Sequence, residues 1–436
     1  MNRRHFARRA VAAGAAGLAL PAAFASLSMV RPKRARSSLS PPDPEQLAAR
    51  YAAMDAAAAR PVLRRELFAE PVVLESVRLI RNGRKFMVEV RDGEGRTGRA
   101  MSNNHQMPYI YTVCLEKVLP FYEGKDARDV DELATGVYNY RSNYKLQNLA
   151  LWVGVATVEF AIYDLLGRIA GLPAGKLISD RIYNPDIAVY QANDHRGRSP
   201  EESLERIIAT QQATGAKAVK FKIGGRMDAP EVPPDRTQRL VPMVRAAFDD
   251  SITLYVDANG SYDVPDGIAM GHFLADNGID LYEEPCPIDH YNDWLAIGRA
   301  VDLPLAGGGA EASMYAFRWM MAEGGFEVAQ PDPFYFGGMT RAVKVARMAE
   351  AVDVPIVPHI SGTDLCYLWL LHYVSAIPNA GPYHEFKGTA PDLPFTCATS
   401  SLETEDGVLK VPTGPGSGVD YAPDYLAKFT EVEPVS

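Results

Sequence analysis

From Asp186 onward, short apolar runs alternate with longer amphipathic segments. The runs are rich in β-branched and aromatic residues, as is typical of strands: IAVYQAN, AVKFKIG, ITLYVDANG, IDLYEEP, LPLAGGG, FEVAQPD, VPIVPH and GPYHEF. The segments between them, such as PEESLERIIATQQATG and MTRAVKVARMAEAV, repeat apolar residues at helical spacing. Eight strands joined by seven helical crossovers predict a closed parallel α/β barrel over residues 181–400, rather than an open sheet.

The residues before this pattern, 71–180, predict a separate α+β domain. Two strand-like segments flank Asn82-Gly83, a dipeptide typical of tight β-hairpins. A helical pattern follows in GVATVEFAIYDLLGRIAGLPAGKLI, and we expect the helix to stop at Gly171 and Pro173. Residues 401–436 are rich in turn-forming residues, and we expect them to return to this first domain.

The N-terminus has the pattern of an export signal. The basic stretch MNRRHFARR precedes small and apolar residues that end in Ala23-Phe24-Ala25, which suits signal cleavage. Arg3-Arg4 followed by Phe6 favours a twin-arginine signal over residues 1–25, with an ordinary secretory signal as the alternative. We expect residues 26–70 to form a linker and one helix. We therefore expect a periplasmic or secreted protein.

Composition narrows the class of protein. The net charge of −9 and the lack of a long basic run after the leader argue against nucleic acid as a partner. With 47% hydrophobic and 23% charged residues, the chain resembles an ordinary globular protein. We expect no membrane span after the leader. The cysteines are too scattered to predict a disulfide framework or a CxxC motif: Cys114, Cys286, Cys366 and Cys397.

Polar side chains recur at the carboxyl ends of the predicted strands. In a parallel barrel these ends meet at one mouth, where the active sites of such barrels lie. In chain order, the candidate site residues are Asn193, Lys220, Lys222, Asp257, Glu283, Glu311, Asp332, His359 and Glu385. Because their spacing follows the strand–helix repeat, the series predicts one common site.

On one part of this mouth, the residue types indicate a metal-assisted base. Asp257 and Glu283 each close an apolar strand, and carboxylates on adjacent strands suit Mg²⁺. In isolation, Asp257 would fit the start of an Asp-Ala-Asn-Gly turn, and Glu283 or Glu284 would fit a helix cap or a salt bridge. Lys220 and Lys222 are two residues apart and share one face of their strand. Repulsion between two ammonium groups favours proton loss from one of them, so Lys222 is a candidate base and Lys220 a substrate contact.

A second acid–base group is predicted on later strands. Asp332 and His359 end successive strands, and a carboxylate beside an imidazole fixes its tautomer and supports its protonated form. Glu385, on the last predicted strand, is a candidate neutral acid that donates a hydrogen bond to a developing oxyanion. A salt bridge at the barrel rim is the alternative for Glu385.

Taken together, these motifs resemble the enolase superfamily, specifically its mandelate racemase-like branch. The resemblance covers roughly Leu74–Asp420 and rests on TVEFAIYDLLGRIAGLP, VKFK, VDAN, EEP, QPDPFYFGG, VPH and DGVLKVPTGPGSG in this order. It implies an α+β capping domain over a (β/α)7β TIM-like barrel, and a homo-oligomer. It also implies abstraction of the proton α to a carboxylate, with Mg²⁺ as the cofactor.

The resemblance gives each candidate residue a role. Asp257 and Glu283 become metal ligands, and Asn259 becomes a group that tunes Lys222 and contacts substrate. The groups that handle protons become Lys222 (assisted by Lys220), His359 with Asp332, and Glu385 as the electrophilic acid.

The expected reaction is dehydration of an acid sugar, an aldonate-type hydroxy carboxylate, to a 2-keto-3-deoxy acid. It would proceed by α-proton abstraction through a metal-stabilised enolate. One alternative is a racemase or epimerase of a 2-hydroxy acid on the same scaffold. Another is a non-catalytic protein that binds sugar acids and has a degraded metal site. In each case the partner is a small-molecule carboxylate, and not a nucleic acid or, for the mature protein, a membrane.

Two departures from the superfamily pattern stand out. Gly308-Gly309 occupies the place of an expected Gly-Glu, so a third metal ligand is absent there. Glu311 is the candidate substitute, because the glycines would let the backbone bend toward an ion; water or a weakened site are the alternatives. The other departure is the short Asn82-Gly83 turn, where relatives insert a long loop over the substrate. Either the site is more open in this chain, or Met101–Tyr111 covers it instead.

Overall fold

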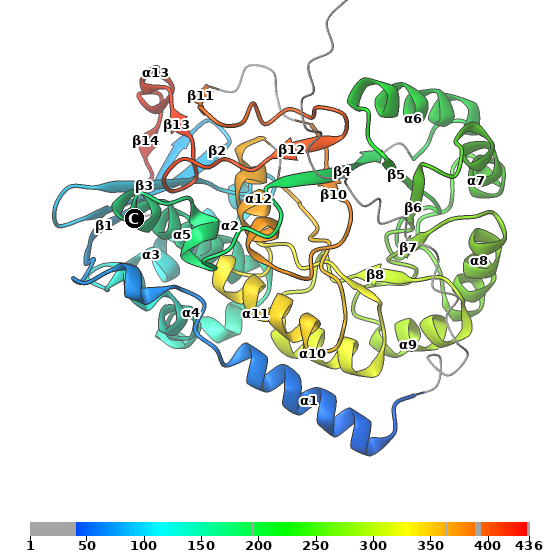
Figure 1. Ribbon diagram of the computed structural model, residues 1–436, viewed down its shortest axis with the longest axis horizontal. Helices are drawn as coiled ribbons and strands as arrows, with labels where there is room; N and C mark the ends of the chain where they lie inside the picture. Colours follow the sequence, from blue (N-terminus) through cyan, green and yellow to red (C-terminus); the bar gives the residue numbers. More distant parts are fainter. Residues whose placement is uncertain (1–40, 194–195, 363, 389–393, 434–436) are drawn as a thin grey trace, which may run out of the picture. The chain divides into compact units, whose positions relative to one another are not determined.

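The computed structural model describes residues 41–193, 196–362, 364–388 and 394–433. The predicted export signal over residues 1–25 lies outside these ranges. Within the predicted linker, helix α1 (Pro44–Ala58) begins at Asp43, whose side chain accepts a hydrogen bond from the Gln46 backbone N–H at 2.8 Å. This helix packs against α10 and α11 of the barrel (Figure 1).

The first part of the capping domain is an antiparallel sheet in the order β14-β1-β2-β3. Its strands are β1 (Leu74–Asn82), β2 (Lys85–Asp92), β3 (Thr97–Met101) and β14 (Thr430–Glu431). The predicted hairpin between β1 and β2 is present: Asn82 pairs with Lys85, and Gly83 has a φ of +59°. The C-terminal strand β14 pairs with β1.

Helices pack against this sheet and against one another. They are α2 (Met107–Val113), a π-helical turn (Cys114–Val118), α3 (Leu119–Tyr122), α4 (Val130–Asn139) and α5 (Leu149–Ala170). Helix α5 packs on β2 and β3, and a Cβ atom on Gly98 of β3 would lie 2.2 Å from the Ala161 carbonyl oxygen. This glycine is what allows the strand and the helix to approach so closely. As predicted, α5 ends at Gly171, which adopts a left-handed conformation.

Helix α5 is also long and apolar enough to cross a membrane, a feature that the sequence prediction missed. In the fold, 89% of its most apolar window is buried. Its apolar character is therefore explained by its place in the protein core.

The barrel strands run parallel in the order β10-β4-β5-β6-β7-β8-β9. They are β4 (Asp186–Asn193), β5 (Ala218–Lys222), β6 (Thr253–Asp257), β7 (Leu281–Glu283), β8 (Leu305–Gly307), β9 (Val328–Ala329) and β10 (His384–Phe386). Parallel bridges from Ala329 to Ile356 and from Ile356 to Ala380 link β9 to the segment before β10. The sheet thereby curls back on itself, as a TIM-like barrel requires.

Helices surround these strands (Figure 1). They are α6 (Pro200–Thr214), α7 (Arg236–Ala247), α8 (Val264–Asp276), α9 (Tyr291–Ala300), α10 (Met314–Glu323), α11 (Met339–Glu350) and α12 (Tyr367–Ala376). After β10, the chain forms β11 (Phe395–Thr396), β12 (Val408–Lys410), β13 (Asp420–Tyr421) and α13 (Pro423–Leu426). Strand β12 pairs antiparallel with β4, so the C-terminal segment contacts both the barrel and the capping sheet.

The barrel interior is apolar toward the amino ends of the strands and charged toward their carboxyl ends. The apolar part is a cluster of buried side chains: Tyr190, Ala218, Tyr255, Leu281, Ala306 and Val357. Along β5, Lys220 and Lys222 follow Ala218 at steps of two residues and therefore point inward on the same face. Because side chains alternate between the two faces of a strand, the ionisable side chains near the strand ends point into the barrel, at the mouth formed by the carboxyl ends.

Candidate active site

Lys220 forms the floor of the charged region. Its Nζ lies 2.8 Å from both carboxylate oxygens of Glu283 and 3.6 Å from Oε1 of Glu385. Only 1% of the side chain is exposed. Burial lowers the pKa of Lys220, but Glu283 and Glu385 raise it well above its ordinary value. Lys220 is therefore a buried positive charge that supports two carboxylates, and its contact with substrate stays a prediction.

Lys222 lies two residues further along β5, closer to the mouth, and forms an ion pair with Asp257. Asn259 organises this pair: its backbone N–H donates to Asp257 at 2.8 Å, and its side-chain amide donates to Asp257 and Glu284 at 3.2 and 3.1 Å. Arg196 donates in turn to the Asn259 side-chain oxygen at 2.7 Å. Burial raises the pKa of Asp257, but Lys222 and Lys220 more than offset this, so the group remains ionised.

Glu283 stands beside Asp257 in register on the next strand. In addition to Lys220, it accepts a hydrogen bond from the Gln330 side-chain amide at 2.9 Å. Burial, together with the nearby charges of Asp257 and Glu385, raises the pKa of Glu283 to about 7 despite the opposing effect of Lys220. The carboxylates of the site are buried and close together, and this disfavours the ionised form of Glu283.

The predicted dyad of Asp332 and His359 is present. His359 Nδ1 and Asp332 Oδ2 are 2.9 Å apart. Asp332 also accepts backbone N–H bonds from Phe334, Tyr335 and Ser361 at 2.8, 3.2 and 2.7 Å. Burial lowers the pKa of His359, but Glu385 and Asp332 together raise it above its ordinary value, which favours the imidazolium form.

Glu385 lies between the two parts of the mouth. Its Oε2 accepts the Ile360 backbone N–H at 3.0 Å, and its Oε1 lies 3.4 Å from Lys387 Nζ. Burial raises the pKa of Glu385, but Lys220 and Lys387 lower it well below its usual range. This arrangement favours the carboxylate, and not the neutral acid that we predicted, because two ammonium groups flank it.

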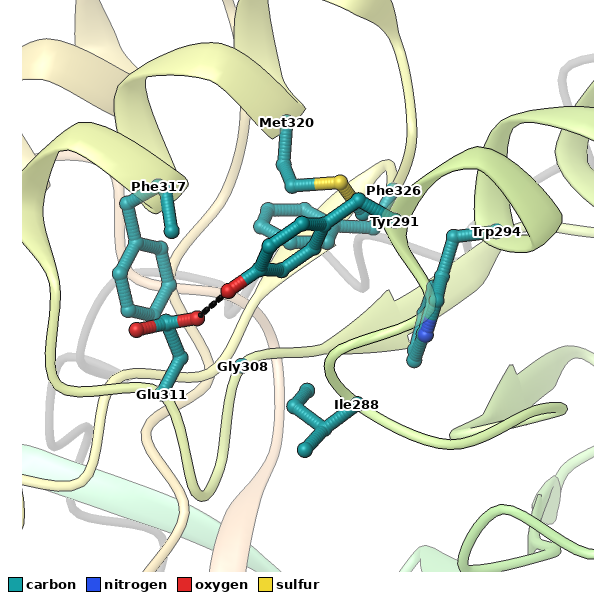
Figure 2. A pocket seen from close by; sticks show the side chains of 9 residues that line it. Ile288, Tyr291, Trp294, Gly308, Glu311, Phe317, Met320 and Phe326 are labelled. Atoms are coloured by element: carbon teal, nitrogen blue, oxygen red, sulfur yellow. Dashed lines mark hydrogen bonds between the residues drawn. The ribbon is translucent and has the colours of Figure 1, made fainter.

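Glu311 does not join the other carboxylates. Strand β8 ends at Gly307, and the Glu311 backbone N–H bonds the Gly308 carbonyl in a turn at 3.1 Å. The carboxylate accepts hydrogen bonds from Tyr291 Oη at 2.5 Å and from the Ser313 backbone N–H at 2.6 Å. Figure 2 shows it facing Tyr291 in a small pocket lined by aromatic and apolar side chains. Within the described ranges, no three His, Cys, Asp or Glu side chains are grouped to hold a metal ion.

The capping domain reaches the mouth through residues after β3. The buried Asn103 donates from its side-chain amide to Ser361 Oγ, and the Gln106 amide donates to Tyr335 Oη at 3.1 Å. Both barrel residues adjoin the Asp332–His359 dyad. The segment predicted to cover the site therefore contacts it. Asn193 ends β4, but its side chain lies outside the part of the structure that can be described.

Four residues at the site were not predicted: Arg196, Glu284, Gln330 and Lys387. Three had a usable signal, because Glu284 directly follows Glu283, and Gln330 and Lys387 lie two residues from Asp332 and Glu385 on the same strand ends. Arg196 lies in the loop after β4, where no alternation rule places a side chain.

Comparison with known proteins identifies the fold. A model of the family described as enolase C-terminal domain-like matches residues 203–425, which is more than half of the chain. The chain belongs to this family. D-galactarolactone cycloisomerase of Agrobacterium fabrum is 26% identical over 324 residues, covering 71% of this chain and 82% of that protein. Arabinonate dehydratase of Saccharolobus solfataricus is 24% identical over 332 residues, covering 76% and 86%.

Solved structures agree with the family assignment. The crystal structure of a proposed racemase from Roseobacter denitrificans superposes with a TM-score of 0.76 at 28% identity, covering 83% of this chain and all 100% of that chain. A mandelate racemase/muconate lactonizing protein from Paracoccus denitrificans, complexed with magnesium, gives a TM-score of 0.73 at 21% identity, covering 83% and 98%. The predicted fold class, a TIM-like barrel with a capping domain, is confirmed.

Proposed function

We propose that this family member is an acid-sugar dehydratase that converts a hydroxylated carboxylic acid into a 2-keto-3-deoxy acid. The position of Glu385 supports this most. Its Oε1 lies 3.6 Å from Nζ of Lys220, which shares the inner face of β5 with Lys222. Its Oε2 accepts the backbone N–H of Ile360, the residue after His359, at 3.0 Å, so the strand ends that carry Lys222 and His359 serve one mouth. The dehydratases among the relatives favour the same reaction class.

In the proposed reaction, Lys222 leaves its ion pair with Asp257 and accepts the proton from the carbon α to the substrate carboxylate. His359 donates the Nε2 proton to the β-hydroxyl, which leaves as water. Nδ1 is bonded to Asp332, so Nε2 is the nitrogen left for substrate. The resulting enol then ketonises to the 2-keto acid. The imidazolium form that this role needs is the one favoured by Glu385 and Asp332.

The oxygen donors suit Mg²⁺ at two of the three positions that the sequence named. Asp257 and Glu283 are buried neighbours, and proteins hold Mg²⁺ through one or two carboxylates together with substrate and water oxygens. These carboxylates now pair with Lys222 and Lys220, so an ion and the ammonium groups compete for them. When bound, Mg²⁺ supplies positive charge that stabilises negative charge developing on the substrate carboxylate.

A racemase or epimerase is the second candidate. It is favoured by the presence of two separate proton-transfer groups, because one can remove a proton and the other can return it on the opposite face. The expected dehydratase and this alternative share Lys222 and His359 and differ in whether the leaving β-hydroxyl or the α carbon receives the second proton.

The deciding experiment screens purified protein with Mg²⁺ against a library of aldonates and aldarates in D₂O. Release of a 2-keto acid that is lost in Lys222→Ala supports the dehydratase. Deuterium in recovered substrate without a keto acid supports the racemase. Binding of an acid sugar with neither outcome would favour the non-catalytic protein.

We also propose export through residues 1–25, on the basis of Arg3-Arg4. Replacing this pair by two lysines should retain the precursor inside the cell, as seen by cell fractionation. Unchanged export would favour an ordinary secretory signal.

A further inference from the structure

Lys387 lies at the barrel mouth and has no part in the proposed proton transfers. It follows Glu385 by two residues, just beyond the end of β10. Its Nζ donates to the Ile360 carbonyl oxygen at 2.8 Å and lies 3.4 Å from Oε1 of Glu385. The ammonium group therefore points into the mouth, beside the backbone of the residue that follows His359.

The charged groups on this flank differ in how far solvent reaches them. Among the charged side chains that the structure describes here, the carboxylates are hidden: 2% of Glu385 and 0% of Asp332 is exposed. The basic groups are the accessible ones, with 25% of the His359 side chain and 34% of the Lys387 side chain exposed. A ligand that approaches this flank therefore meets positive charge first, which favours an anionic group.

The partners of Lys387 leave it able to bind a ligand. An ammonium group carries three N–H donors. One is used at the Ile360 carbonyl oxygen, and another faces Glu385 at a distance that is long for a hydrogen bond. At least one donor can therefore turn toward a ligand. Glu385 does not depend on Lys387 alone, because Nζ of Lys220 lies 3.6 Å from it.

The place of Lys387 in the barrel relates it to the far end of an acid sugar. In the proposed reaction, the substrate carboxylate and the α carbon lie near Asp257 and Lys222, which end β6 and β5. Strands β4 and β5 separate β10 from β6 in the sheet order. His359 serves the β-hydroxyl, and Lys387 contacts the chain just after His359. Lys387 is therefore placed to meet the part of the substrate that lies beyond the β carbon.

We propose that Lys387 is a specificity-determining residue that binds a second carboxylate at the far end of the substrate. The substrate is then an aldarate, a sugar acid with a carboxylate at each end, and not an aldonate. This inference rests on the proposed function for the orientation of the substrate, and it deepens that function by naming the substrate class. Holding both ends of the molecule fixes the α carbon relative to the base.

The test compares aldarates with aldonates of the same configuration, which differ only at the terminal carbon. The measured quantity is the ratio of kcat/KM for the aldarate to kcat/KM for the aldonate, because changes that act through Glu385 affect both acids and largely cancel. The wild type should prefer the aldarate by about 10- to 100-fold, the size of one hydrogen bond to a charged group. Lys387→Met removes the charge and should bring the ratio to within about two-fold of one. Lys387→Arg keeps the charge and should retain most of the preference.

Lys410→Met is the control, since it removes an exposed ammonium group that pairs with Glu405, 3.7 Å away. It should leave the ratio at its wild-type value. A wild type that prefers the aldonate, or a preference that survives Lys387→Met, would overturn the inference. A third arm uses the 6-phosphoaldonate of the same configuration. Dependence on Lys387 for this acid alone would assign a phosphate and refute the second carboxylate.

Binding measurements separate this inference from the proposed function. If no acid sugar is turned over, titration calorimetry with the same pairs and Mg²⁺ shows whether the aldarate binds more tightly than the aldonate, and whether Lys387→Met removes the difference. That result would keep the inference about Lys387 and reject only the dehydratase. Turnover of both acids with equal dependence on Lys387 would do the reverse. Failure of every aldarate to bind at millimolar concentrations would overturn the inference.

Discussion

The two flanks of the barrel mouth are held in different ways. On the flank formed by β5, β6 and β7, charged side chains bond mainly to one another, as in the pairs Lys220–Glu283 and Lys222–Asp257. On the flank of Asp332, backbone N–H groups hold the carboxylate in place. Side-chain pairs can exchange partners when a ligand arrives, whereas a backbone-anchored carboxylate stays where it is. We infer that the first flank adapts to ion and substrate, while the second is organised in advance.

Lys222→Ala removes the base on the adaptable flank and should give the largest effect. We expect kcat to fall by about 10³-fold or more, in the range of general-base removal, with acid-sugar binding largely kept. Steady-state kinetics measure this, and Lys410→Ala is the control because Lys410 is exposed and pairs with an exposed Glu405. A loss below about ten-fold would mean that another group takes the α-proton.

Asp332→Asn tests the anchored flank. It removes a negative charge that raises the pKa of His359, so that pKa should fall. The imidazolium of His359 should then lose its proton at a lower pH, so the alkaline limb of the pH–rate profile should shift to lower pH. We expect kcat to drop by about 10²-fold. Asp293→Asn is a matched control, since Asp293 pairs with His290 at an exposed site, 3.3 Å away. An unshifted profile would show that Asp332 does not control the protonation of His359.

The contrast between the flanks also explains what the sequence could reveal. Strand alternation places Lys220, Lys222 and Asp257 on one inner face, because the strands continue through these residues. The same rule fails for Glu311, because β8 has ended at Gly307 and Gly308 adopts a positive φ. Residues two apart share a face only while the strand persists.

Charge states were harder to predict than positions. The expectation of a neutral Glu385 ignored Lys387, and the ammonium of Lys220 reaches it from a strand distant in sequence. Such distances depend on tertiary packing, which a linear pattern does not contain. The barrel as a whole followed from the pattern, because each strand and helix carries its own periodicity.

Glu159→Gln asks whether backbone anchoring alone keeps a buried carboxylate ionised. Glu159 on α5 accepts the Thr340 backbone N–H at 2.7 Å, and burial raises its pKa to about 8 from an ordinary 4.5. The folded state therefore holds this proton more tightly, and stability is lost as pH rises from about 4.5 to about 8. The linked loss by pH 7 is about 3 kcal/mol at most.

Denaturant unfolding at several pH values measures this loss. As pH rises across that interval, the unfolding free energy of the wild type should fall relative to that of Glu159→Gln. Glu94→Gln, at an exposed carboxylate, should leave the pH dependence unchanged. Parallel curves for the wild type and Glu159→Gln would mean that Glu159 ionises in the fold without penalty.

The smallest effect is expected where the capping domain meets the anchored flank. Asn103→Ala removes the hydrogen bond to Ser361, whose backbone N–H holds Asp332. Because Asp332 keeps its bonds to Phe334 and Tyr335, kcat should change little, while KM should rise by about two- to ten-fold, the size of one hydrogen bond. Ser361→Ala should have a similar effect, and the double variant should be no worse than either single one. An additive double variant, or a fall in kcat matching that of Asp332→Asn, would show that the dyad depends on the capping domain and is not organised by the barrel alone.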